Sequence, residues 1–399
     1  MTGDGRGATA SSLRDLARLL LSKCKGQGSQ GEGCMLSIFT VVFLGLCVNG
    51  LGVLHYRSYF YVGQSYDTQN GLIIARGAMY VEHLVPEKVT QSFPLVFIHG
   101  VGMTGTNLLE TIDGEPSWAD YFLGEGYELY LVDAPNRARS AWHQGVDGPQ
   151  SALDAVEVES RFTAPERFNI WPQAALHTQW PGNGSVGDPI FDNFYAATVQ
   201  SLVSDLESSE KIKAAGSALL DKIGPAIVMV HSQAGPYGWI LADARPALVK
   251  AVIALEPTGP PFMNAVFPPL TAARPYGVAE TPLQYSPPID SPDQLVRDLV
   301  YNDTSVNVLC YRQASPARQL VNLIDVPILM VTSPSGYHTL YDNCTADYLV
   351  QAGVTVDHIH LAGIGIHGNG HMMFMERNRK QLARDVVQKW LLKTFKDHV

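Results

Sequence analysis

A serine placed directly after an apolar run is the first residue in this sequence that could do covalent chemistry. Ser232 follows Ala226–His231 (AIVMVH), and it precedes a helical stretch, Tyr237–Ala244. A serine on a sharp strand-to-helix turn presents its hydroxyl for nucleophilic attack, and the turn requires small residues two positions before and after it. Ala234 is small, but Val230 stands where glycine is usual. The pentapeptide predicts a nucleophile at Ser232, and it is equally compatible with an ordinary strand end and turn.

A glycine-rich loop follows a second apolar run. Pro94–His99 (PLVFIH) predicts a strand buried on both faces, and Gly100–Gly105 (GVGMTG) follows it. In proteins with such a serine turn, this loop supplies one backbone N–H of an oxyanion hole, and the residue after the nucleophile supplies another. We therefore expect the amides of Val101 or Gly102, and of Gln233, to stabilise the negative charge of a tetrahedral intermediate. No Gly-Lys-Ser/Thr is present here and no Gly-x-Gly-x-x-Gly opens a predicted helix, so a phosphate-binding loop is excluded.

Two histidines near the end of the sequence could act as the general base. In this arrangement the acid and then the histidine follow the serine along the chain. The glycine-rich segment 363–372 follows the last predicted strand and contains both His367 and His371. His371 directly precedes the terminal helix, so we expect it to take the serine proton, with His367 as the alternative.

Two carboxylates that follow predicted strands could orient this histidine. Glu256 ends the strand Val249–Leu255, and Asp342 comes after the strand Pro327–Val331. A carboxylate at the carboxyl end of a strand can fix the imidazole tautomer and stabilise its charged form. These residues by themselves leave Glu256 and Asp342 open as the acid. Asp133, at the end of the fourth strand, is expected to be structural.

The elements that must position these residues alternate between strands and helices. Apolar or β-branched runs predict strands at Tyr59–Val62, Leu72–Leu84 with a bulge at Gly77, Pro94–His99, Tyr127–Val132, Ala226–Val230, Val249–Leu255, Pro327–Val331 and Val354–Leu361. Met373–Thr394 predicts a terminal amphipathic helix. The alternation predicts an α/β fold with a mostly parallel central sheet and helices on both faces. Two long segments without periodicity, near 136–195 and 257–290, predict cap insertions.

Four segments make the sequence resemble a particular group of secreted esterases. They are Thr163–Gln173 (TAPERFNIWPQ), Gly187–Tyr195 (GDPIFDNFY), Ala254–Pro257 (ALEP) and Gly368–Met372 (GNGHM). The likeness spans roughly residues 58–395 and is to bacterial and fungal carboxylesterases of the α/β-hydrolase fold. In that group the triad acid is a glutamate after the sixth strand, so the resemblance implies a triad of Ser232, Glu256 and His371. It also implies arylesterase or carboxylesterase activity without a metal or other cofactor.

Three functional interpretations follow. The first is a serine hydrolase that cleaves a small-molecule carboxylic ester through an acyl-enzyme. The second, implied by fungal relatives that accompany biosynthetic clusters, is a tailoring hydrolase of secondary metabolism that acts on a polyketide or peptide-like natural-product intermediate. The third is a non-catalytic binding module on the same fold, although such modules typically lack a triad residue.

Charge and the spacing of cysteines and histidines argue against nucleic-acid binding and against a zinc site. Only 17% of the residues are charged, the formal net charge is −10, and no Lys/Arg-rich run occurs. The sequence therefore offers no cluster of positive charge that could bind the phosphates of a nucleic acid. No Cys/His cluster has the spacing of a zinc site, which argues against a metal of that kind.

The N-terminal residues predict entry into the secretory pathway. Residues 1–34 form a polar tail rich in Gly, Ser and Ala, and Met35–Leu54 is the longest uncharged apolar run in the sequence. Its length is sufficient to cross a hydrocarbon core of about 30 Å. Residues 35–55 therefore predict either a single-pass signal anchor or the apolar core of a cleaved signal peptide. Either way, residues 56–399 would form a catalytic domain in the lumen or outside the cell.

Sequons and cysteines are consistent with that compartment. Asn183, Asn302 and Asn343 begin Asn-x-Ser/Thr triplets and are candidate glycosylation sites. Of the five cysteines, only Cys310 and Cys344 fall in the predicted catalytic domain. An oxidising compartment would allow a disulfide between them, and two buried free thiols are equally compatible with the sequence.

Overall fold

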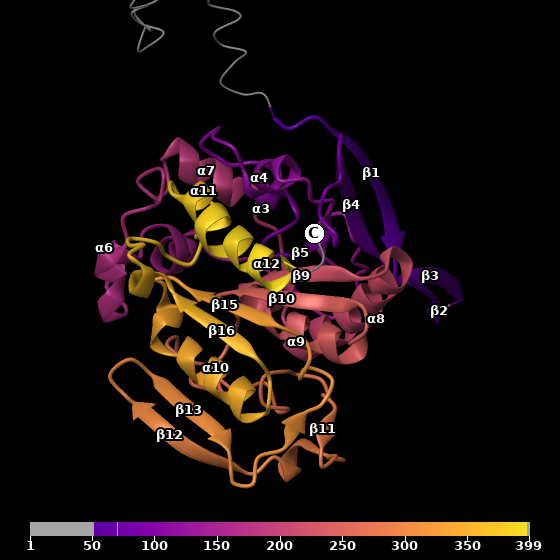
Figure 1. The fold of residues 1–399 in the computed structure, drawn as a ribbon, viewed down its shortest axis with the longest axis vertical. Coiled ribbons are helices and arrows are strands. Elements are labelled where there is room, and N and C mark those ends of the chain that lie inside the picture. Colours follow the sequence, from indigo (N-terminus) through magenta and orange to yellow (C-terminus); the bar gives the residue numbers. More distant parts are fainter. Residues whose placement is uncertain (1–51, 70, 397–399) are drawn as a thin grey trace, which may run out of the picture. The chain divides into compact units, whose positions relative to one another are not determined.

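An eight-stranded sheet forms the centre of the computed structural model, which describes residues 52–69 and 71–396 (Figure 1). The strand order is β1-β4-β6-β5-β9-β10-β15-β16. These strands are β1 (His55–Val62), β4 (Met79–Pro86), β5 (Leu95–Ile98), β6 (Leu129–Asp133), β9 (Ala226–His231), β10 (Val249–Leu255), β15 (Ile328–Thr332) and β16 (Val356–His360). From β6 to β16 neighbouring strands are parallel, whereas β4 is antiparallel to both β1 and β6. The predicted α/β fold with a mostly parallel sheet is confirmed.

Strand β5 illustrates why the sheet is covered on both faces. All of its residues are apolar and buried. Successive side chains of a strand point to opposite faces of the sheet. Val96 and Ile98 accordingly belong to one hydrophobic core, and Leu95 and Phe97 belong to the other. A strand that is apolar on both faces requires a layer of helices on each side.

Helices supply these two layers (Figure 1). The core that contains Val96 includes residues of α8 (Asp205–Ile223) and α9 (Gly235–Ala244). The opposite core includes residues of α4 (Trp118–Gly124) and of the C-terminal helical segment. That segment comprises α11 (Arg379–Leu382), a π-helical stretch (Ala383–Gln388) and α12 (Lys389–Thr394). The remaining α-helices are α3 (Thr106–Leu109), α5 (Ala155–Val158), α6 (Pro165–Phe168), α7 (Pro189–Ala196) and α10 (Asp342–Gln351).

Two predicted elements have different limits in the structure. The strand predicted over Leu72–Leu84 is divided at Gly77, whose φ of +70° favours glycine. β3 (Leu72–Arg76) pairs with β2 (Ser65–Gln69) in a separate hairpin, so Gly77 ends a strand and is not a bulge within one. The terminal helix begins at Arg379 and not at Met373, because the preceding residues form turns.

A second hairpin, outside the central sheet, is not predicted by the sequence patterns. It consists of β12 (Arg297–Asp303) and β13 (Val308–Gln313), which pair antiparallel. Cys310 of β13 forms a disulfide with Cys344 of α10, with a Cα–Cα distance of 5.8 Å. The disulfide that the sequence left open is therefore present. The remaining short strands are β7 (Gln150–Ser151), β8 (Ser201–Leu202), β11 (Tyr285–Ser286) and β14 (Gln319–Leu320).

The two segments predicted as caps differ in structure. Residues 136–195 contain α5, α6, α7 and short π- and 3-10-helical stretches. Residues 257–290, all of which are described, contain no helix and only the short strand β11. Whether either segment acts as a cap over a substrate stays a prediction.

The predicted N-terminal segments lie outside the described residues, except for residues 52–55. The prediction of a signal anchor or signal peptide over 35–55 therefore remains a prediction, as does that of a polar tail over 1–34. Among the described helices, none has both the length and the apolar character needed to cross a membrane. Asn183, Asn302 and Asn343 are all exposed, and their glycosylation also stays a prediction.

Candidate active site

The turn between β9 and α9 holds Ser232. β9 ends at His231, and Ser232 begins a 3-10 turn, Ser232–Ala234, that leads directly into α9. The φ of Ser232 is +56°, a left-handed conformation that costs free energy in a residue other than glycine. Its side chain is buried. The structure thus places the predicted nucleophile on a strained strand-to-helix turn.

A glycine in α9 accommodates the valine at the atypical position of this turn. A Cβ built on Gly238 would lie 3.3 Å from Cγ2 of Val230 and 2.8 Å from Cγ1 of Val252. Any larger residue at 238 would therefore push the helix away from the sheet. The absence of a side chain at Gly238 leaves the room that Val230 occupies.

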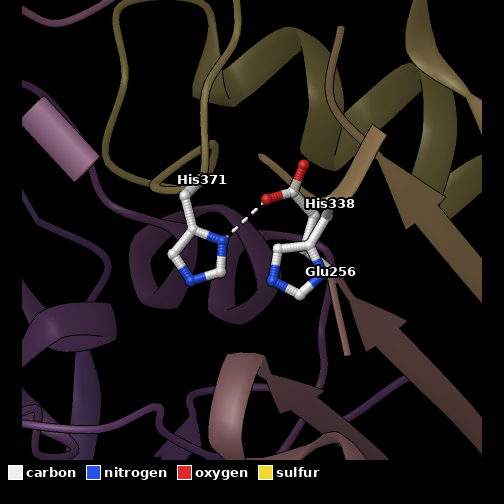
Figure 2. A group of neighbouring side chains, drawn as sticks. All are labelled: Glu256, His338 and His371. Atoms are coloured by element: carbon white, nitrogen blue, oxygen red, sulfur yellow. Dashed lines mark hydrogen bonds and ion pairs between the residues drawn. The ribbon is translucent and has the colours of Figure 1, made fainter. Parts of the chain in front are cut away.

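His371 and Glu256 form a buried pair next to this turn (Figure 2). Nδ1 of His371 lies 2.6 Å from Oε2 of Glu256, and both side chains are fully buried. Glu256 directly follows β10, and its other carboxylate oxygen accepts hydrogen bonds from the backbone N–H and the hydroxyl of Ser333. Burial raises the pKa of Glu256, and the hydrogen bonds from Ser333 oppose this shift. Burial lowers the pKa of His371, which keeps its imidazole neutral and able to accept a proton.

Asp342, the alternative acid, contacts a different histidine. Its Oδ1 lies 3.0 Å from Nδ1 of His338, and its Oδ2 accepts a hydrogen bond of 2.6 Å from the hydroxyl of Thr332. The His338 ring stacks on that of His371, with centroids 4.8 Å apart and an interplanar angle of 7° (Figure 2). Burial lowers the pKa of His338 to about 4, so this second imidazole is neutral at pH 7. Asp342 therefore orients His338, while Glu256 contacts His371.

The remaining histidine candidate lies elsewhere. His367 is exposed, and its backbone carbonyl accepts a hydrogen bond from the side chain of Gln179. The structure brings His371, and not His367, into contact with Glu256.

Glu256, His338 and His371 are also the group in the described part of the chain whose potential ligand atoms lie close enough to hold a metal ion, all within 4.8 Å of one another. These atoms do not form an open ligand set. One carboxylate oxygen of Glu256 is hydrogen-bonded to His371 and the other to Ser333. Nδ1 of His338 is hydrogen-bonded to Asp342. The potential ligand atoms are engaged by one another and by Ser333 and Asp342, so the arrangement fits an acid–base pair better than a metal site.

The glycine-rich loop after β5 approaches Ser232 at Gly100. A Cβ on Gly100 would lie 3.0 Å from Cβ of Ser232, so the two backbones are in close contact. The N–H of Gly102, one of the predicted oxyanion donors, donates to the hydroxyl of Ser201 at 2.9 Å and is therefore engaged. The amide of Val101 has no hydrogen-bond acceptor among the described residues, and that of Gln233 lies in the first turn of a helix, where N–H groups have no intrahelical acceptor. Val101 and Gln233 are thus the available donors.

His99, at the start of this loop, has a structural role. Its Nε2 accepts the N–H of Ala134 at 3.0 Å, and its Nδ1 lies 3.0 Å from the carbonyl oxygen of Gly100. Burial and the nearby Arg137 guanidinium lower the pKa of His99 to about 3. At pH 7 the ring is neutral, with the proton on Nδ1, so it connects the loop to the residues after β6. Asp133 supports the same loop by accepting the N–H of Gly105 at 2.9 Å.

Two aromatic residues that the motifs did not predict complete the surroundings of the base. The hydroxyl of Tyr337 lies 3.5 Å from Nε2 of His371 and is near the side chain of Ser232. Phe162, in the segment 136–195, stacks on His371 with ring centroids 5.1 Å apart. Tyr337 lies in the loop after β15, where the sequence pattern indicates a carboxylate, Asp342, and not an aromatic hydroxyl. Its position after the same predicted strand, five residues before Asp342, was the sequence feature that could have indicated its place in the site.

A family model described as the alpha/beta hydrolase family matches residues 95–385, which include the glycine loop, the serine turn, Glu256 and His371. The chain belongs to the alpha/beta hydrolase family. The predicted fold class and the predicted family are both confirmed.

Two other proteins resemble this chain over most of its length. A "Probable secreted lipase phiG" from Fungal sp. (strain ATCC 74256) is 46% identical over 337 residues, which are 84% of this chain and 89% of that protein. The solved structure of a novel bacterial esterase superposes with a TM-score of 0.58 at 19% identity, covering 86% of this chain and 98% of the esterase. The latter likeness shows the fold alone. The family match and the fungal relative confirm the expected resemblance to secreted enzymes of this family.

Proposed function

We propose that this chain is a serine hydrolase that cleaves carboxylic esters through a Ser232–His371–Glu256 triad. The observation that carries the proposal is the buried contact of 2.6 Å between Nδ1 of His371 and Oε2 of Glu256, beside the turn that holds Ser232. A carboxylate at this position fixes the imidazole tautomer, so that Nε2 is the nitrogen without a proton. Nε2 is the atom that faces the hydroxyl of Tyr337, which in turn contacts Ser232.

The reaction proceeds in two acyl-transfer steps. Oγ of Ser232 attacks the ester carbonyl carbon while Nε2 of His371 takes the hydroxyl proton, and the carbonyl electrons move to the oxygen. The tetrahedral intermediate collapses, the alcohol leaves with the proton from His371, and an acyl-enzyme remains. Water then attacks the acyl-enzyme carbonyl in the same way, with His371 taking its proton, and the carboxylic acid is released from Ser232.

Two amides stabilise the oxyanion in both steps. The N–H groups of Val101 and Gln233 donate hydrogen bonds to the negative oxygen. Because the fold already holds both groups in place, they do not have to reorganise when the charge develops. Glu256 stabilises the imidazolium that forms on His371. Tyr337 holds the hydroxyl of Ser232 near His371 before the substrate binds. The activity requires no metal and no other cofactor for these steps.

The proposal is tested with a fluorophosphonate probe and p-nitrophenyl esters of increasing acyl length. We expect the wild-type chain to be labelled and to turn over esters, and Ser232→Ala to lose both activities. Ser209→Ala, which changes a buried serine of α8, is the matched control and should keep both. Labelling that persists in Ser232→Ala would contradict the proposal. A folded wild-type chain that neither reacts nor hydrolyses any ester would favour the non-catalytic binding module.

The acyl-chain series also addresses the substrate class. The fungal relative is named as a lipase, so we infer that longer acyl chains are accepted as well as short ones. Natural-product tailoring remains the alternative. Turnover of lactone or thioester intermediates at rates above those of all simple esters would support it instead.

We further propose that the catalytic domain enters the secretory pathway. Support comes from the fungal relative, which is named as secreted, and from the disulfide between Cys310 and Cys344. The exposed sequons Asn183, Asn302 and Asn343 are compatible with passage through a glycosylating compartment.

A further inference from the structure

We propose that Arg137 is a positioning residue of the oxyanion hole, which holds the peptide between Gly100 and Val101 so that the Val101 N–H faces Ser232. The inference rests on the proposed function, because it concerns the same site. Arg137 is not part of any motif discussed above; it lies in the turn after β6.

The guanidinium of Arg137 binds the glycine loop at two points. Nη1 donates to the carbonyl oxygen of Gly100 at 3.0 Å and to that of Met103 at 3.1 Å. The carbonyl of Gly100 also faces Nδ1 of His99 at 3.0 Å. The backbone N–H of Met103 donates to the same oxygen at 3.3 Å, so three donors, of which Arg137 is the only cation, fix the direction of this one carbonyl group.

The direction of the Gly100 carbonyl determines the direction of the next N–H. In a trans peptide the C=O and the N–H that share one plane point to opposite sides. Because the Gly100 oxygen points to Arg137, the Val101 N–H points away from it. The backbone of Gly100 lies against Ser232, so this N–H is presented on the nucleophile's side of the loop. Rotation of the peptide would replace the N–H with an oxygen, which would repel the oxyanion.

The same side chain also contacts Gln233, whose backbone N–H is the second oxyanion donor. Nη2 of Arg137 donates to Oε1 of Gln233 at 3.2 Å, and Nε2 of Gln233 donates to Asp205 at 3.0 Å. One guanidinium thus connects the loop that carries Val101 to the turn that carries Gln233. The planar fork of arginine allows several donors to be placed at once, which lysine cannot reproduce.

Burial and backbone conformation indicate that this arrangement carries a cost in stability. Arg137 is 5% exposed, and all the acceptors named above are uncharged oxygens. A buried cation without a hydrogen-bonded carboxylate is unfavourable for folding. Both neighbours, Asn136 and Ala138, adopt left-handed backbone conformations, with φ of +62° and +47°. Strain of this kind persists at functional sites, where the geometry it holds is required.

The test compares wild type, Arg137→Met and Arg137→Lys. Each variant is assayed for kcat and KM on a p-nitrophenyl ester and for the affinity of a trifluoromethyl ketone, which forms a tetrahedral adduct with the serine. We expect Arg137→Met to lower kcat by about 10²-fold, the effect of losing one oxyanion donor, with KM changed less than about threefold. The affinity for the ketone should fall by a similar factor. Arg137→Lys should lie between the two, because its single ammonium can reach fewer acceptors.

Arg274→Gln is the matched control. Arg274 is another buried arginine that donates to backbone carbonyls, those of Pro260 and Met263. We expect this variant to have a lower melting temperature than wild type. Its kcat and its affinity for the ketone should keep the wild-type ratio to each other. Circular dichroism establishes which variants are folded.

The outcomes separate this inference from the proposed function. A folded Arg137→Met variant that keeps wild-type kcat, or that loses kcat without losing ketone affinity, would overturn the role of Arg137 alone. If Arg137→Met does not fold, the same criteria apply to Arg137→Lys. A wild-type chain that forms no adduct with the ketone and hydrolyses no ester would overturn both proposals.

Discussion

At the scale of single residues, the neighbours of two buried carboxylates separate their roles. Glu256 and Asp342 are both fully buried, and each contacts the Nδ1 atom of a histidine. The histidine beside Glu256 reaches the hydroxyl of Tyr337 near Ser232, whereas the one beside Asp342 bonds to Tyr341. Only the first pair is connected to Ser232, the proposed nucleophile.

This difference predicts unequal effects of two conservative substitutions. Glu256→Gln should lower kcat on an aryl ester by about 10⁴-fold, because the amide favours the wrong imidazole tautomer. Asp342→Asn should have a much smaller effect, since it alters His338, which stacks on the ring of His371 and makes no hydrogen bond to it. Steady-state kinetics of both variants are the measurement. A larger loss of kcat in Asp342→Asn would assign the acid to Asp342.

At the scale of elements, a buried histidine joins α6 to the loop that carries His371, the proposed base. Nδ1 of His177 lies 3.0 Å from Glu166 of α6, and its Nε2 lies 2.9 Å from Glu376. The Glu376 carboxylate also accepts the N–H of Gly370, the residue before His371. Burial alone would lower the pKa of His177, but the hydrogen bonds to the two glutamates outweigh it and raise the pKa to about 9.

The raised pKa of His177 predicts a pH-dependent contribution to stability. The folded state binds the proton more tightly than the unfolded state, whose histidine pKa is about 6.5. The contribution is therefore complete below about pH 6.5 and is lost as the pH rises through about 9. We expect the difference in melting temperature between wild type and His177→Gln to shrink over that interval. Thermal denaturation followed by circular dichroism measures it, and a difference that is constant or increases with pH would contradict the prediction.

The disulfide between β13 and α10 predicts a second effect on stability. It joins residues separated by 34 positions, so it restricts a sizeable loop in the unfolded chain. Replacing Cys310 and Cys344 together with alanine should lower the free energy of unfolding by about 2–4 kcal/mol. Neither cysteine contacts the triad, so kcat of the folded variant should stay within a few-fold of wild type. Urea denaturation provides the free energy, and an unchanged midpoint would show that the bridge does not stabilise the domain.

At the scale of the whole catalytic domain, the order of the strands assembles the site. β5, β9, β10 and β15 are consecutive neighbours and parallel, so the loops after their carboxyl ends lie side by side. These loops carry Gly100, Ser232, Glu256 and Tyr337 in that order. Sites of parallel α/β sheets form at this edge because the chain leaves every strand there.

The proposed secretion belongs to the same scale. Expression of the full-length chain in a fungal host should place the active enzyme in the medium, with an N-terminus that follows the apolar run Met35–Leu54. Activity in the medium and N-terminal sequencing are the measurements. Activity that stays with membranes and is released only by detergent would instead support the single-pass anchor.

The sequence by itself determined the α/β fold, the family, and the candidates for nucleophile, acid and base, because each depends on local patterns. Apolar runs specify buried strands, and glycine or serine after them specifies the turns. Only the tertiary structure decided that Glu256 contacts His371, that the Gly102 amide is occupied by Ser201, and that Arg137 and Tyr337 face the site. These contacts join residues far apart in the chain. Their distances follow from strand order and loop conformation, which no short stretch of sequence encodes.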